Sequence, residues 1–209
     1  MKANAAQDSQ DWMQARAGKF TASRAADLMA RTKSGPGAAR ANLIATLVAE
    51  RITGQPVEGY RNAAMERGIE LEGEARDAYS FQTGQAVVET GFIACDWLPN
   101  TGCSPDGMVG DDGLVEIKCP SAMAKHMDAI LTGAHADEYR WQLQHQLMVT
   151  GREWVDAYSY DPRWPENLQQ AIRRVTRDEE AIKQLSEEIR KADAEVEAKV
   201  AELQNKEQQ

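Results

Sequence analysis

Residues 101–120 constrain the fold of this 209-residue chain more than any other segment. Apolar-rich runs at 107–110 and 114–118 flank Asp-Asp-Gly at 111–113, a combination that favours a tight turn. This pattern predicts a β-hairpin. Because alternate side chains of a strand share one face, one side of the second run is expected to turn toward the core.

Three charged side chains can meet on the other side of this hairpin. Glu116 and Lys118 would share one face while Ile117 points into the core. Asp106, at the far end of the partner strand, could meet Glu116 across the hairpin, and the backbone carbonyl of Ile117 could complete an oxygen cage for Mg²⁺. Lys118 would sit beside this cage, near an attacking water or a phosphate, where such an arrangement assists phosphodiester hydrolysis. The spacing alone also fits an ordinary surface hairpin.

The residues around Asp106, Glu116 and Lys118 indicate the protein class more specifically. Residues 101–107 read Thr-Gly-Cys-Ser-Pro-Asp-Gly, and residues 114–120 read Leu-Val-Glu-Ile-Lys-Cys-Pro. This sequence resembles the active-site segment of the lambda-type phage exonucleases, which are YqaJ-like viral recombinase nucleases of the PD-(D/E)xK superfamily. Ordered matches run from about residue 11 to 164 and include positions 12–16, 21–23, 67–68, 72, 75–76, 139–144 and 160–163.

The resemblance implies a metal site on the hairpin. Asp106, Glu116 and the Ile117 carbonyl match the ligands of Mg²⁺, which Mn²⁺ can replace, and Lys118 matches the catalytic lysine. Glu72 matches an acidic helix residue that would complete a second metal site, so two metal ions are expected in the active complex. An exposed helical glutamate is the alternative interpretation of Glu72.

The resemblance also implies contacts with the end of a DNA duplex. A guanidinium with hydroxyl and amide donors suits a 5′-terminal phosphate, and the matching residues are Arg16, Ser23, Ser104 and Gln142. Lys33 stands where the family has an arginine in a loop that enters the DNA, so it keeps the charge but loses the planar fork. Met65 matches an apolar residue that wedges the duplex end apart.

The activity implied by this resemblance is a Mg²⁺-dependent 5′-to-3′ exonuclease. It would digest one strand of linear double-stranded DNA and leave 3′ single-stranded overhangs for phage-type single-strand annealing recombination. A homotrimeric ring and a single-strand annealing protein are the expected partners, in the cytoplasm of a bacterial host and from a phage or prophage. A PD-(D/E)xK endonuclease of restriction or repair type would use the same triad, and a non-catalytic DNA-binding protein would need the carboxylates only for structure.

Charge and composition set further limits. The net charge is −9 and the pI is near 4.9, which opposes binding to a polyanion. Residues 1–67 nevertheless carry ten Lys and Arg against six Asp and Glu, so one face of the protein could attract DNA. The alternative is that these basic residues only form a solvated surface. No apolar run approaches a membrane span, no signal pattern begins the chain, and three cysteines without C-x-x-C spacing favour reduced thiols in the cytoplasm.

The order of predicted elements favours an α+β fold, with a central mixed sheet flanked by helices. This corresponds to the restriction-endonuclease-like core that the resemblance implies. Residues 1–10 are expected to be disordered, 11–209 to form a single nuclease domain, and 31–37 to be a mobile loop. Helices are predicted near 9–16, from 21 or 23 to 30, and over 43–52, 62–83, 126–131 and 137–150; strands are predicted over 86–88, 92–94 and 154–160.

A long amphipathic helix is predicted over about 178–205. Its apolar residues recur at intervals of three and four, at Ile182, Leu185, Ile189, Ala192, Val196, Val200 and Leu203. This stripe is expected to cover the sheet of its own domain. A subunit or partner contact through the same stripe is the alternative.

Overall fold

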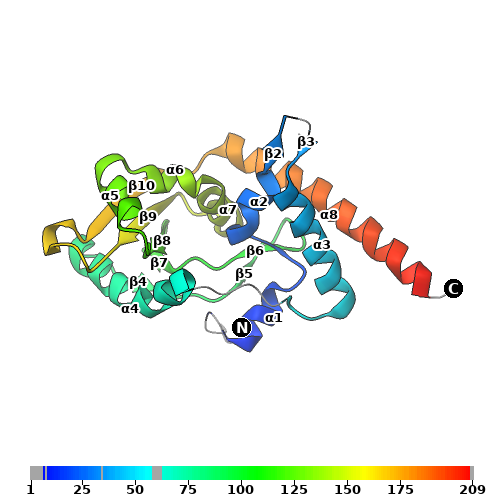
Figure 1. Ribbon diagram of the computed structural model, residues 1–209, viewed down its shortest axis with the longest axis horizontal. Helices are drawn as coiled ribbons and strands as arrows, with labels where there is room; N and C mark the ends of the chain where they lie inside the picture. The colour runs from blue at the N-terminus through cyan, green and yellow to red at the C-terminus, as the bar shows by residue number, and fades with distance from the viewer. Residues whose placement is uncertain (1–6, 8, 34, 58–62, 208–209) are drawn as a thin grey trace.

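The computed structural model describes residues 7, 9–33, 35–57 and 63–207 (Figure 1). The predicted α+β architecture with a mixed sheet is confirmed. Of the segment predicted to be disordered, residues 1–6 and 8 lie outside the described residues. Gln7 donates hydrogen bonds to the Thr90 and Pro105 carbonyls, and Ser9 caps the first helix by accepting from the Trp12 amide at 3.2 Å.

The central sheet has five strands in the order β10-β9-β8-β7-β4. Strands β8 and β9 are parallel, and the other neighbours are antiparallel. The predicted hairpin is confirmed, because β7 pairs with β8 in a register that sets Gly107 opposite Val115. The strands are β4 Val87–Val88, β7 Gly107–Val109, β8 Gly113–Lys118, β9 Trp154–Tyr160 and β10 Gln170–Thr176.

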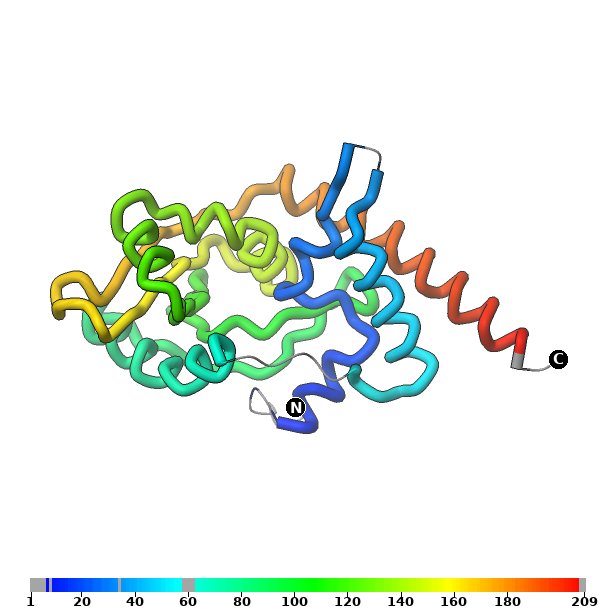
Figure 2. The backbone as a smooth tube through the Cα atoms, in the orientation of Figure 1, coloured from blue at the N-terminus to red at the C-terminus, as the bar shows by residue number. Residues whose placement is uncertain are grey.

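Helices cover both faces of this sheet. Helix α4, Ala63–Thr83, packs Ala75 and Tyr79 on the face that holds Ile117. On the opposite face, Leu143 and Leu147 of α7, Arg140–Thr150, pack against the alternate residues of β8 and β9. The tube in Figure 2 shows α4 and α7 on opposite sides of the strands. Glu116 and Lys118 therefore face α7, while Ile117 faces α4.

Smaller elements surround the sheet. A second sheet has the order β1-β6-β5, and Gly102 of β6 allows close packing because a Cβ there would meet the Phe92 ring at 2.2 Å. The helix predicted from 21 or 23 to 30 is shorter, because β1 pairs with β6 before a 3-10 turn and α2 begin. These elements are β1 Phe20–Thr21, the turn Ala22–Arg24, α2 Ala25–Met29, β5 Ile93–Ala94 and β6 Thr101–Cys103.

Other predicted boundaries also shifted. The segment predicted as a loop at 31–37 contains a short hairpin formed by β2, Arg31–Thr32, and β3, Gly35–Pro36. The single helix predicted over 137–150 is broken at Tyr139, which separates α6 from α7. The remaining helices are α1 Gln10–Arg16, α3 Ala38–Thr53, α5 Met123–Thr132 and α6 Ala134–Glu138. No helix of the described segments is long and apolar enough to span a membrane.

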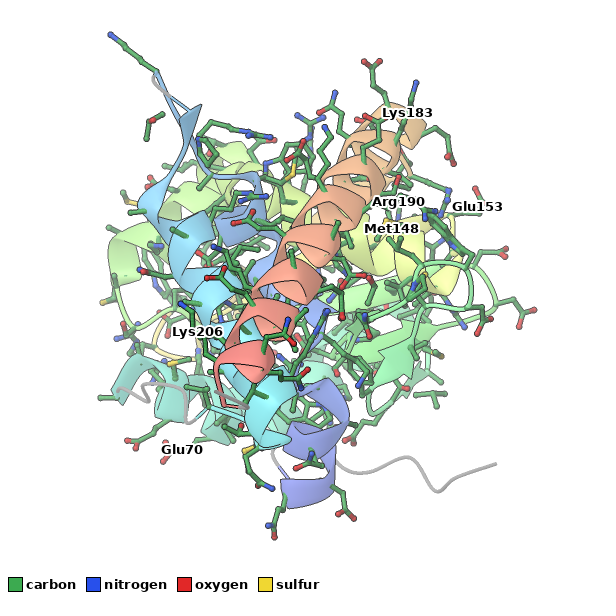
Figure 3. All side chains as sticks on the ribbon, turned by 90° about the vertical axis from the view of Figure 1, so that its right-hand side faces the viewer. Glu70, Met148, Glu153, Lys183, Arg190 and Lys206 are labelled. Carbon is green, nitrogen blue, oxygen red and sulfur yellow. The ribbon has the colours of Figure 1, made fainter. Side chains whose placement is uncertain are left out.

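The predicted long C-terminal helix is present as α8, Glu179–Glu207. The prediction that its apolar stripe covers the sheet is wrong. Its stripe from Ile182 to Val196 is buried against α2, α3 and α7, which are helices, rather than against the sheet. Figure 3 looks onto this side, where α8 crosses the front of the molecule from Lys183 to Lys206. Helix α8 therefore closes a separate helical core beside the sheet.

Ion pairs also tie α8 to the N-terminal third of the chain. Arg40 pairs with Glu195 at 2.8 Å, and Arg51 pairs with both Asp193 at 2.6 Å and Glu197 at 2.5 Å. Arg31 pairs with Glu188 at 2.6 Å. Much of the basic excess noted in the sequence is thus matched by acids of α8.

Candidate active site

The structure brings together the three charged residues of the hairpin. Asp106 follows Ser104-Pro105 and accepts a hydrogen bond from the Ile117 amide at 2.6 Å through Oδ2. Glu116 is only 3% exposed, and its Oε1 accepts from Lys118 Nζ at 2.5 Å. The β7–β8 register places Asp106 beside Glu116. The local hairpin pattern therefore builds this cluster without long loops.

Helix α7 holds the Glu116 carboxylate from above the sheet. Gln142 Nε2 donates to Oε1, and Gln146 Nε2 donates to Oε2 at 2.5 Å. Residues four apart share one face of a helix, so both amides reach the same carboxylate. The sequence interpretation assigned Gln142 to a phosphate and missed Gln146. The Gln-x-x-x-Gln spacing within a helix next to the sheet is the signal that could have found it.

The cluster is electrostatically crowded. Burial, together with the negative charge of Glu116, raises the pKa of Asp106 well above its usual range. Burial alone would lower the pKa of Lys118, but the Glu116 and Asp106 carboxylates outweigh it and raise the Lys118 pKa. The Lys118 ammonium also lies 4.7 Å from the centre of the Tyr139 ring. Two carboxylates thus share one ammonium, and a further cation would relieve their repulsion.

The donor set fits a hard divalent cation. Asp106 and Glu116 offer carboxylate oxygens and Ile117 offers its carbonyl, which are the ligand types that Mg²⁺ prefers. Glu72 of α4 lies close enough for its charge to raise the pKa of Asp106 as well, and its carboxylate pairs with Arg76 at 2.5 Å. Within the described part of the chain, no three His, Cys, Asp or Glu side chains gather as a metal cluster. A second metal site through Glu72 stays a prediction.

Arg16, Ser23 and Ser104 come together as a second cluster. The Arg16 guanidinium donates to Ser23 Oγ at 3.1 Å and to Ser104 Oγ at 3.5 Å. Trp12 also donates its indole N–H to Ser104 Oγ at 2.9 Å, and its ring lies 4.0 Å from the Arg16 guanidinium carbon. The sequence interpretation gave Trp12 no role. Its spacing of four residues from Arg16 in a helix was the available signal.

Both clusters open into one cavity of about 580 Å³. Met65 and Glu72 of α4 also line it, whereas Lys33 does not and lies exposed in the turn between β2 and β3. A cavity lined by carboxylates and by a guanidinium can hold a cation and an anion at once. The predicted residues that line it are Arg16, Ser23, Met65, Glu72, Ser104, Asp106, Glu116, Ile117, Lys118 and Gln142.

A mixed sheet whose central hairpin presents Asp106, Glu116 and Lys118 on one face defines a nuclease core of the PD-(D/E)xK type. The family model described as the YqaJ-like viral recombinase domain matches residues 11–153. The chain belongs to this family. A comparison with curated proteins finds no match.

Solved structures agree with this assignment. The chain is 43% identical to an alkaline exonuclease from Laribacter hongkongensis, with a TM-score of 0.86 over 95% of this chain and 97% of the other. The same exonuclease in complex with dAMP matches at 43% identity, a TM-score of 0.87 and the same coverage. A phage-related exonuclease from Haemophilus somnus 129PT shares the fold, with a TM-score of 0.73 over 88% and 96% of the two chains at 15% identity. The chain is therefore a nuclease of the family to which the Laribacter enzyme belongs.

Proposed function

We propose that the protein is a Mg²⁺-dependent exonuclease that digests one strand of linear double-stranded DNA from its 5′ end and leaves 3′ overhangs. One observation carries the proposal: the Arg16 cluster and the Asp106–Glu116 cluster line the same cavity. A site for a terminal phosphate beside a hydrolytic centre ties cleavage to a strand end. The dAMP complex of the 43% identical relative supports it, because a deoxynucleoside monophosphate is the class of product that a DNA exonuclease releases.

Different residues of this chain bind the terminal phosphate, the metal ion and the scissile phosphate in this proposal. Arg16, with the Ser23 and Ser104 hydroxyls, binds the 5′-terminal phosphate and fixes the strand relative to the hairpin. Asp106, Glu116 and the Ile117 carbonyl would hold Mg²⁺, which when bound would supply Lewis-acid stabilisation of the charge that develops on the scissile phosphate. Lys118 donates to the same phosphate and balances its charge. Mn²⁺ would serve in place of Mg²⁺ in this scheme, and Glu72 would help to hold a second ion.

End dependence is the feature that separates this proposal from its alternatives. Purified protein is incubated with Mg²⁺ and either linear duplex DNA or the same DNA as a covalently closed circle. We expect hydrolysis of the linear form alone. Cleavage of the circle would instead identify an endonuclease, and binding without hydrolysis would identify a DNA-binding protein.

Polarity needs a second experiment. A linear duplex carries one fluorophore at an internal position near the 5′ end of one strand and another near the 3′ end of the same strand. Loss of the 5′-proximal label first is expected, and early loss of the 3′-proximal label would overturn the proposed direction. The Asp106→Ala protein is the matched control for contaminating nucleases.

Assembly and cellular context form part of the same proposal. The lambda-type resemblance supports a homotrimeric ring that encloses DNA and passes its 3′ overhang to a single-strand annealing protein. We place this activity in the cytoplasm of a bacterial host, as a phage or prophage function. Light scattering of the purified protein tests the trimer, and a monomeric mass at the concentration used for hydrolysis would refute it.

A further inference from the structure

Gln146 contacts the Glu116 carboxylate of the candidate active site without lining the cavity. Its side chain is 0% exposed and does not line the cavity, yet Nε2 donates to Glu116 Oε2 at 2.5 Å. Gln142, one turn earlier on α7, does line the cavity and donates to the other oxygen of Glu116. Substrate groups that enter the cavity would meet Gln142 before they meet Gln146.

The two oxygens of Glu116 are used unequally. Oε1 accepts from both Lys118 and Gln142, so its two lone pairs are occupied. Oε2 accepts one hydrogen bond among the described residues, from Gln146, and keeps the capacity for another partner. The Gln146 bond therefore fixes the orientation of the whole Glu116 carboxylate, which lines the cavity.

Gln146 makes this contact in a way that fold stability does not explain. Its Oε1 is buried and has no hydrogen-bond partner among the described residues. A buried unpaired carbonyl lowers stability, and reversing the amide would set that oxygen against the Glu116 carboxylate. An apolar side chain of similar size would avoid this penalty but would leave Glu116 Oε2 without the donor that it has among the described residues, so the use of the amide lies in its contact with Glu116.

We propose that Gln146 is a positioning residue of the hydrolytic site, which holds the Glu116 carboxylate in the orientation that binds the divalent cation. This inference rests on the metal-dependent hydrolysis given under Proposed function. Side chains that orient a metal ligand change metal affinity or activity by about 10-fold to 100-fold when they are removed. Loss of Gln146 is expected to have an effect of that size.

Two substitutions remove the contact in different ways. Gln146→Met keeps the volume and loses the donor, whereas Gln146→Asn keeps the amide and withdraws it by one methylene. Gln144→Met is the matched control on the same helix, because Gln144 is also buried but joins the Thr176 carbonyl and the Asp178 amide, each at 2.9 Å. Each variant is measured for its melting temperature with and without Mg²⁺ in the absence of DNA, and for hydrolysis of linear duplex over a range of Mg²⁺ concentrations.

Both Gln146 variants should fold, with a modest fall in the apo melting temperature because Glu116 Oε2 loses its donor. They should need about 10-fold to 100-fold more Mg²⁺ for half-maximal hydrolysis and for half of the Mg²⁺-induced rise in melting temperature. Gln144→Met should lower the apo melting temperature and leave both Mg²⁺ midpoints within twofold of wild type.

Mg²⁺ midpoints and rates within twofold of wild type in both Gln146 variants would overturn the inference. A fall in apo melting temperature with unchanged Mg²⁺ midpoints would do so as well, since it would make Gln146 merely structural. If Gln146→Met does not fold, Gln146→Asn decides. Wild-type protein that hydrolyses no linear DNA with Mg²⁺ would instead refute the proposed function.

Discussion

Arg16 offers the sharpest prediction, because its proposed partner can be deleted from the substrate. The guanidinium is held in place by Ser23, Ser104 and the Trp12 ring before any DNA binds. A preorganised fork of this kind loses little side-chain entropy when it grips a phosphate. Arg16→Ala should therefore affect duplexes with a 5′-phosphate far more than duplexes with a 5′-hydroxyl.

The size of this effect follows from the number of bonds. A hydrogen bond to a charged group contributes about 1.5–3 kcal/mol, and a guanidinium fork can donate two to one phosphate. Part of that gain replaces the existing bonds to Ser23 and Ser104, which leaves a net contribution of about 3 kcal/mol, or roughly a 100-fold preference, at tenfold per 1.4 kcal/mol. Arg16→Ala should reduce this preference to below about tenfold, and Arg16→Lys should lie between, because it keeps the charge without the fork.

The assay compares initial rates on two blunt duplexes that differ only in the 5′ group, for wild type, Arg16→Ala and Arg16→Lys. Arg24→Ala is the matched control, since Arg24 is half-exposed, pairs with Asp27 at 2.7 Å and does not line the cavity. Its phosphate preference should equal that of wild type. If Arg16→Ala slows both duplexes by the same factor, the guanidinium does not read the terminal phosphate and the reasoning is wrong.

Three further predictions test the site and its support. Asp106→Ala and Lys118→Ala should each lower the hydrolysis rate by at least about 100-fold without unfolding the protein, and a rate near wild type in either would remove that residue from the site. Asp156→Ala should cost about 1–3 kcal/mol in urea unfolding, because buried Asp156 accepts from Tyr79 and Arg174 at 2.8 Å and its loss leaves the buried Tyr79 hydroxyl unpaired. Adding Tyr79→Phe should recover part of the loss, and a further additive loss would contradict this. Burial lowers the pKa of His145, beside the Gly102 backbone, to about 4, so the unfolded chain binds a proton more readily below about pH 6.5. Stability should be complete above pH 6.5 and fall by up to about 3 kcal/mol toward pH 4, and His145→Gln should flatten this dependence in urea unfolding.

The parts of the fold that could be predicted from sequence are those set by neighbours along the chain. The hairpin was predictable because its turn residues and its alternation lie within one short segment, and Asp106 meets Glu116 as a direct result of the register. The period of α8 was predictable for the same reason. What α8 covers was not, since an apolar stripe identifies the buried face of a helix and says nothing about which element lies opposite.

The missed elements depend on contacts between distant segments. Strand β10 lies at the edge of the sheet and carries the consecutive charged residues Arg173 and Arg174, so apolar and polar side chains do not alternate clearly along it. Its strand structure depends on pairing with β9. Strand β1 has two residues and exists because β6 lies beside it. In the sequence, nothing distinguishes Gln146 from other polar residues of a helix. Its contact with Glu116 arises only because α7 packs against β8. Such positions become visible only when the tertiary arrangement is known.

The arrangement of charge resolves how an acidic chain can act on a polyanion. Arg31, Arg40 and Arg51, which made the N-terminal third look basic, pair with acids of α8 and stabilise the helical core. They therefore do not form a broad basic surface for DNA. Arg16 and Lys118 instead face a cavity, where limited solvent makes each charge act more strongly on a phosphate than it would on an open surface. An enzyme that engages a strand end needs such local recognition of a few phosphates, and net charge says little about that.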